Sequence, residues 1–112
     1  MEPATDIVIG SFEKIDLRVG TITRAERIEK SEKLLKLEVF FGESGTRTIV
    51  GGIGRAFDPV GVLGKQVVVV FNLVPRKVMG IESHGMLLAA PTSTGGLVLA
   101  SCPGAPDGAR LG

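Results

Sequence analysis

The strongest constraint on the fold of this chain is the near-regular alternation of side chains between Leu35 and Phe41. Every second residue of this stretch is a large apolar one, and successive side chains of a strand point to opposite faces. The alternation therefore predicts a half-buried strand, which ends at Gly42. The segment 42–45 predicts a hairpin turn, after which a second strand is expected at 46–50.

Further strand patterns lie on both sides of this pair. The segment 17–26 is strand-like, but its alternation slips at Gly20, where we expect a bulge or a sharp coil of the strand. The Val-rich run Lys65–Leu73 predicts a strand that is buried on both faces. Two more strands are expected at 85–90 and 97–100, on either side of a Thr-Ser-Thr-Gly-Gly turn.

Helical signals in the chain are brief. The segment 58–63 has room for a single helical turn, although it contains a glycine that weakens helix formation by about 1 kcal/mol. A second short helix is expected at 9–14, with Ser11 as its N-terminal cap.

The order of these elements is three strands, a helical turn and two strands, which is the plan of the OB-fold. We therefore expect an all-β protein: a five-stranded OB-fold barrel with a short helical turn and extra C-terminal strands. The 16 glycines of the chain suit a small barrel, whose strands must bend sharply. A β-sandwich is the alternative, but its seven or so strands need more strand signals than the chain contains.

The chain length of 112 residues predicts one domain over 1–112. A domain of this size buries roughly two-thirds of the surface of its unfolded chain, which suffices for one core without a metal or a disulfide. The barrel core is expected at about 12–90, and we expect 91–112 to form a C-terminal extension.

Side chains with catalytic or metal-binding spacing are missing from the sequence. Cys102 and His84 are the only cysteine and histidine, so neither an internal disulfide nor a zinc site is expected. Glu82 and Ser83 precede His84 directly, and adjacent strand residues face opposite ways, so we expect no catalytic triad. The glycines at 51–54 lack the GxGxxG spacing and a long following helix, which favours a bend at a strand end. We expect no enzyme, no catalytic residue, no metal and no cofactor.

The N-terminal segment Met1–Asp6 is acidic and lacks the basic start of a signal peptide. The chain also contains no apolar run of about 18 residues, the minimum for a membrane-spanning helix. A cytoplasmic protein without a membrane partner is therefore expected.

Charge is unevenly distributed along the chain, although the formal net charge is only +1. Five basic residues and one acidic residue lie at 44–81. Arg76 and Lys77 follow Pro75 in the expected turn between the fourth and fifth strands, and the connection between the first two strands carries Lys33. OB-folds bind nucleic acids along strands 2 and 3 and with the neighbouring loops, so two basic loops would flank one binding face. A pair of cations that only adds solubility is the alternative.

Aromatic residues are scarce: the chain has no Trp, no Tyr and five Phe. Most of the Phe residues are needed for the core, whereas proteins that bind single-stranded nucleic acids rely on several exposed aromatic side chains. The composition therefore favours a ligand recognised by its backbone and shape, such as a folded RNA.

Four segments resemble the tRNA-binding domain family: 12–22, 31–39, 52–53 and 72–90. The most specific of them is the string Asn-x-x-Pro-Arg-Lys…Gly-x-x-Ser-x-Gly-Met, which runs from Asn72 to Met86. The family includes the C-terminal appendage or beta subunit of methionyl-tRNA synthetase, stand-alone dimeric tRNA-binding proteins and a secretion-chaperone-like branch.

The resemblance implies an OB-fold that binds tRNA by shape, without catalysis, and forms a homodimer through elements outside the barrel core. Such a protein acts in trans or as an appendage of methionyl-tRNA synthetase, which is a candidate partner. The chaperone-like function, binding of unfolded polypeptide, stays open as the alternative. The stretch at 31–36 is more similar to the synthetase branch than to the chaperone-like branch.

The resemblance also implies a set of RNA-contacting residues. These are Lys33, Arg55, Asn72, Arg76, Lys77, Ser83 and Met86. The cations would attract phosphates, the amide and the hydroxyl would donate or accept hydrogen bonds, and the methionine would pack on a base or a sugar.

Overall fold

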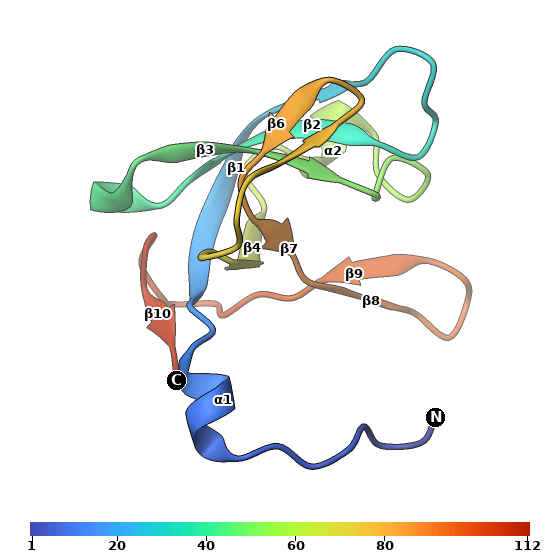
Figure 1. Ribbon diagram of the computed structural model, residues 1–112. Helices are drawn as coiled ribbons and strands as arrows, with labels where there is room; N and C mark the ends of the chain where they lie inside the picture. The colour runs from blue at the N-terminus through green and yellow to red at the C-terminus, as the bar shows by residue number, and fades with distance from the viewer.

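The computed structural model describes all residues, 1–112, and consists mainly of antiparallel strands (Figure 1). The strands are β1 Leu17–Arg27, β2 Leu35–Phe40, β3 Thr46–Gly51, β4 Gln66–Val70, β5 Arg76–Val78, β6 Ile81–Ser83, β7 Met86–Leu87, β8 Ala89–Pro91, β9 Leu97–Leu99 and β10 Arg110–Leu111. The helices are α1 Ile9–Glu13 and α2 Pro59–Val62, with a 3₁₀ turn at Gly42–Ser44. Neither helix is long and apolar enough to cross a membrane.

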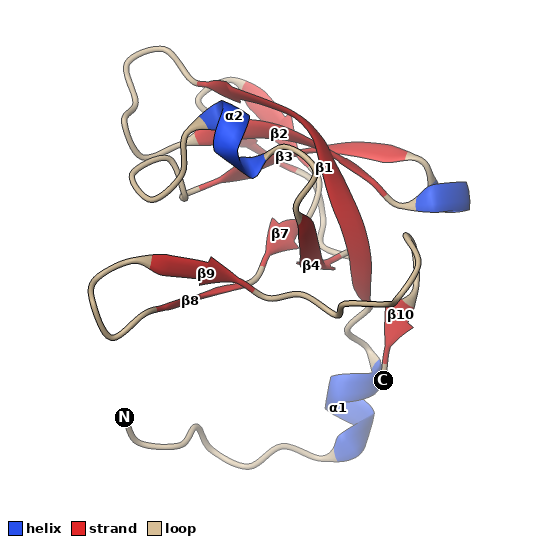
Figure 2. Ribbon diagram, turned by 180° about the vertical axis from the view of Figure 1, so that it is seen from behind, coloured by secondary structure: helices blue, strands red, loops and turns tan.

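The main sheet has the strand order β3-β2-β1-β4-β7 and curls into a half-barrel (Figure 1). Strand β1 is shared between the two halves, because its residues 17–21 pair with β4 and its residues 21–27 pair with β2. Strand β10 pairs with the start of β1, so the C-terminal residues lie on the barrel. The predicted all-β, OB-like fold is confirmed. Two hairpins, β5–β6 and β8–β9, extend from the main sheet, and Figure 2 shows the second of them projecting away from it.

The irregularity expected at Gly20 lies further along β1, where the register with β2 shifts between Ile22 and Arg24. Gly20 itself does not form the bulge but allows a close contact with the core. A Cβ atom at this position would lie 2.6 Å from Cγ1 of Val39 and 2.7 Å from the ring of Phe41. Glycine therefore lets the middle of β1 approach the core closely at the point where its pairing passes from β4 to β2.

The core lies between the curled strands and follows the predicted patterns. The inward positions of β2, Leu35, Leu37 and Val39, are fully buried, whereas Phe40 is 39% exposed. The residues Val67–Val69 of β4 are all buried, which confirms a strand covered on both faces. These buried side chains remove most of the apolar surface of the main sheet from water, which is the dominant stabilisation of such a fold.

The two helices are as short as predicted. Helix α2 begins at Pro59, a residue suited to a first helical turn, and it buries Val62. Helix α1 buries no side chain, and its N-terminal boundary residue is Val8, without a side-chain cap. The prediction that Ser11 caps α1 is therefore wrong: Ser11 lies inside the helix, because the helix starts two residues before it.

Candidate nucleic-acid interface

The segment between β4 and β7 is a hairpin rather than a plain turn. Arg76 and Lys77, expected in the turn, lie on β5, and the turn itself is formed by Met79 and Gly80. Both turn residues have positive φ, 52° and 80°, as a tight hairpin turn requires. The basic pair is therefore held in an extended strand, which separates and orients its two side chains.

The hairpin lies along β3. The backbone N–H of His84 donates to the carbonyl of Thr48 (2.9 Å), and the N–H of Val50 donates to Oγ of Ser83 (2.9 Å). Ser83 is only 2% exposed. The Ser83 side chain lies between the hairpin and β3, where RNA cannot reach it. We therefore no longer expect Ser83 to contact RNA.

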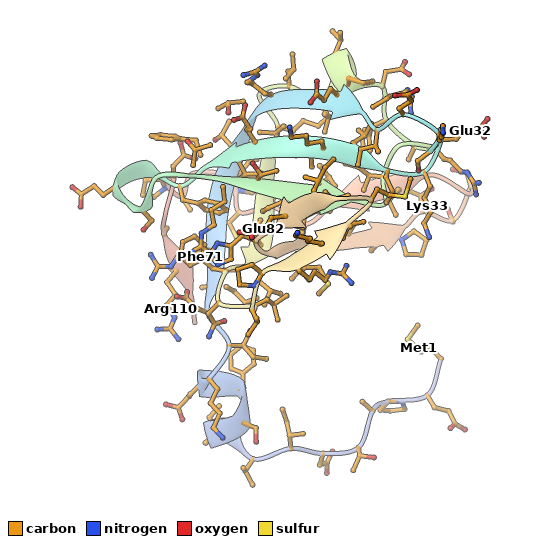
Figure 3. All side chains as sticks on the ribbon, turned by 45° about the horizontal axis from the view of Figure 1, so that its top comes forward. Met1, Glu32, Lys33, Phe71, Glu82 and Arg110 are labelled. Carbon is orange, nitrogen blue, oxygen red and sulfur yellow. The ribbon has the colours of Figure 1, made fainter.

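Register within the hairpin decides where its charges point. Arg76 pairs with Ser83, and Lys77 pairs with Glu82. Opposed residues share a face, so Lys77 and Glu82 project from the face away from Ser83, toward solvent. Figure 3 shows Glu82 on the hairpin in front of the barrel. Both cations are exposed.

Lys33 and Arg55 are brought together by the glycines after β3. The N–H of Gly54 donates to the carbonyl of Lys33 (2.7 Å), and a Cβ atom on Gly54 would lie 2.7 Å from the carbonyl oxygen of Glu32. Only glycine allows this approach of two backbones. Arg27 supports it by donating to the carbonyl of Gly54 (2.9 Å). The strand-end bend predicted at 51–54 thus places two cations on adjacent loops.

The tip of the hairpin reaches the end of β1. Met79 and Ile81 line a hollow of about 360 Å³ together with Arg27 and Ile28. The loop that carries Lys33 follows β1 directly, so the hairpin and this loop are neighbours. Figure 3 shows Lys33 on the right side of the barrel and Phe71, at the base of the hairpin, on the left.

Ion pairing separates the basic residues into two groups. Five of them form ion pairs: Arg18 and Arg110 with Asp16, Arg24 with Glu38, Arg27 with Asp58 and Lys36 with Glu26. The other eight have no carboxylate oxygen within 4.0 Å: Lys14, Lys30, Arg47 and Lys65, and also the four that are predicted to contact RNA, Lys33, Arg55, Arg76 and Lys77. Their positive charge is therefore available to an anionic partner.

The remaining predicted contacts lie near the base of the hairpin. Met86 pairs with Val70 at the edge of β4 and is 46% exposed. Asn72 is exposed, but its amide is already engaged: Oδ1 accepts from the N–H of Asp16 (2.8 Å), and Nδ2 donates to the carbonyl of Lys14 (2.7 Å). The sequence pattern did not indicate these bonds, because their partners are far away in the chain.

His84 and Cys102 are both half-buried, and their backbone N–H groups donate to Thr48 and to the side chain of Gln66, respectively. No group of three or more His, Cys, Asp or Glu side chains is arranged to hold a metal ion.

A cluster of arginines surrounds Asp16 beside Asn72. Arg18 donates to both carboxylate oxygens (2.9 and 3.0 Å), and Nε of Arg110 lies 3.5 Å from Oδ1. The hydrogen bond from Arg18, followed by the charges of Arg18, Arg110 and Arg47, lowers the pKa of Asp16 below its ordinary value, although burial opposes this effect.

This lowered pKa predicts acid sensitivity. Because the unfolded chain takes up the proton at a higher pH than the folded chain, the stabilisation by Asp16 is complete above the unfolded pKa of about 4 and is lost as pH falls through the folded pKa. Urea unfolding of wild type and Asp16→Asn between pH 7 and pH 3 should show a stability difference that shrinks below about pH 4. A difference that stays constant over this range would contradict the assignment.

A curled OB-like sheet with unpaired cations on a hairpin and the adjacent loops is typical of nucleic-acid-binding domains of the OB class. Within that class, residues 17–109 match the family described as "Putative tRNA binding domain", and the chain belongs to this family.

Its relatives with curated names include methionine–tRNA ligases. The chain is 50% identical over 93 residues to the ligase of Caldanaerobacter subterraneus subsp. tengcongensis and 47% identical over 93 residues to that of Methanococcoides burtonii. In each case the match covers 83% of this chain but only 14% of the ligase.

Two solved structures are similar over nearly their whole length. The MetRS-related protein of Pyrococcus horikoshii has a TM-score of 0.87 and 39% identity, over 96% of this chain and 99% of the other. The chaperone CsaA of Bacillus anthracis str. Ames has a TM-score of 0.85 and 29% identity, over 96% of this chain and 100% of the other.

Proposed function

We propose that the chain is a non-catalytic, structure-specific tRNA-binding module. The observation that carries this proposal is a group of cations without carboxylate partners on the hairpin and the neighbouring loops, which includes Lys33, Arg55, Arg76 and Lys77. Met86, exposed at the edge of β4, adds an apolar contact. The ligand is recognised through its phosphates and its shape, since the surface offers few aromatic side chains for stacking.

In the cell, the module acts in trans or as an appendage or beta subunit of methionyl-tRNA synthetase, and it works in the cytoplasm. The similarity to parts of methionine–tRNA ligases supports this role. A module of this kind raises the affinity of its synthetase for tRNA by adding phosphate contacts.

The test of tRNA binding is a gel-retardation titration with bulk tRNA at several salt concentrations. We expect log K to fall linearly with log salt concentration, with a slope near −0.7 to −0.9 for each phosphate contacted. Absence of any shift at low salt would refute the proposal.

A second candidate function is binding of unfolded polypeptide, as in a chaperone. It is favoured by the similarity to the chaperone CsaA and by the exposed apolar side chains of Leu73, Val74 and Met79 on and before the hairpin. An unfolded, reduced protein added to the same titration distinguishes the two functions. If this polypeptide binds and tRNA does not, the chaperone-like function is the correct one.

We also propose that the chain forms a homodimer through α1. The helix buries none of its side chains, and Ile9, Phe12 and Ile15 are exposed. Together with Leu111 they line an open groove of about 650 Å³. A second copy of the chain would cover this apolar surface, and two linked RNA sites would bind one tRNA more tightly than either site alone.

Substitution of Ile9→Asp together with Phe12→Asp tests the dimer. Carboxylates on this face would have to be desolvated on association, so we expect a monomer at concentrations where wild type is dimeric. Analytical ultracentrifugation gives the mass. Ser11→Asp, on the same helix but outside the apolar face, serves as the control and should leave the mass unchanged. A wild type that is monomeric throughout would contradict the proposal.

A further inference from the structure

The segment that precedes β1 is fastened to the base of the hairpin by three hydrogen bonds. The N–H of Phe71 donates to the carbonyl of Asp16 (2.7 Å). The amide of Asn72 makes the other two: Oδ1 accepts from the N–H of Asp16 (2.8 Å), and Nδ2 donates to the carbonyl of Lys14 (2.7 Å). The oxygen and the nitrogen of one side-chain amide therefore both bind a segment that lies more than fifty residues away in sequence.

Helix α1 depends on this attachment for its orientation. None of its side chains is fully buried, and Phe12 is 38% exposed, so packing alone holds the helix only loosely against the barrel. Figure 1 shows α1 below the barrel, connected to β1 by a short segment and lying beside the C-terminal end of β10. Arg110 adds a weaker bond from Nη2 to the carbonyl of Glu13 (3.3 Å).

Asn72 also stands at the start of the basic hairpin. It follows Phe71, whose carbonyl accepts a hydrogen bond from Arg47 and whose ring lies 3.4 Å from the guanidinium carbon of Arg47. From Asn72 the chain passes through Pro75, which restricts the backbone, to Arg76 and Lys77. Asn72 therefore links the start of the basic hairpin to the segment that connects α1 to β1.

We propose that Asn72 is a positioning residue that couples the orientation of α1 to the hairpin, so that self-association through α1 and RNA binding by Arg76 and Lys77 strengthen each other. This inference rests on the proposed function. Coupling of this kind is reciprocal: whatever stabilises the dimer raises the affinity for RNA, and RNA raises the affinity between two copies by the same factor.

The competing explanation is that Asn72 contacts RNA directly. The amide has only one N–H hydrogen and one lone pair of Oδ1 left for such a contact, because the other hydrogen and the other lone pair are used on the backbone of Lys14 and Asp16. The geometry favours positioning, since a side chain that binds two backbone groups is fixed before any ligand arrives.

Asn72→Ala tests the proposal in the full chain. Loss of both bonds is expected to accelerate hydrogen exchange of the Asp16 amide about tenfold in the RNA-free protein. Self-association, measured by sedimentation, and tRNA affinity, measured by titration, are expected to weaken together, each by about tenfold. Asn72→Asp retains the acceptor for the Asp16 N–H but loses the donor to Lys14, so exchange of the Asp16 amide should accelerate less than in Asn72→Ala, and this variant serves if the alanine variant does not fold. Thr94→Ala, a polar truncation in the turn between β8 and β9, is the control.

Two outcomes would overturn the proposal. Asn72→Ala could lose tRNA affinity while Asp16 exchange and self-association stay at wild-type values, which would identify a direct RNA contact. Alternatively, exchange could accelerate with neither association nor affinity changed, which would show that the bonds carry no coupling. A wild type that binds no tRNA would refute the proposed function, whereas the exchange and sedimentation measurements would still decide whether Asn72 holds α1.

Discussion

Replacement of both Arg76 and Lys77 by alanine is expected to weaken tRNA binding by about 100-fold. A hydrogen bond to a charged group contributes about 1.5–3 kcal/mol, so the loss of two corresponds to at least about 3 kcal/mol. The slope of log K against log salt concentration should also become less steep, by about one for each phosphate that the variant no longer neutralises. Both residues are exposed and form no ion pair, so the free energy of unfolding should remain unchanged.

A variant with the same change in net charge provides the control. Arg24 and Lys36 form ion pairs with Glu38 and Glu26 on the outer side of β1 and β2. Arg24→Ala with Lys36→Ala therefore removes two positive charges that are already compensated, and tRNA affinity should fall by only a few fold. Titrations of both double variants at two salt concentrations decide the point. Unchanged binding by a well-folded Arg76→Ala/Lys77→Ala protein would remove the hairpin from the interface.

Truncation of Phe41 is expected to have the largest effect on stability. The side chain is fully buried, and its ring meets that of Phe71 edge to face at a centroid distance of 5.0 Å. Phe41→Ala should lower the free energy of unfolding by about 3–5 kcal/mol, since it leaves a cavity in the core. This is a large part of the roughly 5–15 kcal/mol that is typical of a whole domain.

Phe40, the preceding residue, offers a matched control. It is 39% exposed, so Phe40→Ala should cost much less than Phe41→Ala in the same urea unfolding experiment. Equal losses for the two variants would contradict the assigned register of β2.

The cavity left by Phe41 would also loosen Phe71, which supports Arg47 and the base of the hairpin. A secondary loss of tRNA affinity is therefore expected for Phe41→Ala.

The main sheet could be predicted because its strands carry strong local patterns. The alternation of β2 and the Val-rich run of β4 report burial directly, since side-chain direction in a strand depends only on position along it. The hairpin β5–β6 was missed as a pair of strands. Its strands have only three residues each, too few for a period, and their attachment to β3 comes from Ser83 and His84, which bond to residues far away in sequence.

The candidate site was predicted only in part. Lys33, Arg55, Arg76 and Lys77 are exposed, as their residue type indicates because cations are seldom buried, and their contact with RNA stays a prediction. For Ser83, residue type suggested a hydrogen-bonding group on the surface, but the side chain is buried against β3. For Asn72, residue type could not indicate that the amide binds the segment before β1.

The amino-acid sequence by itself determined the long strands β1 to β4, the single helical turn of α2, the family and the identity of the basic residues, because each depends on residue type and on near neighbours in the chain. Only the tertiary structure decided which of the cations are neutralised by carboxylates and which are free, and which polar side chains are used to hold the fold. The physical reason is that ion pairs and hydrogen bonds act over a few ångströms, and folding alone brings distant residues within that range.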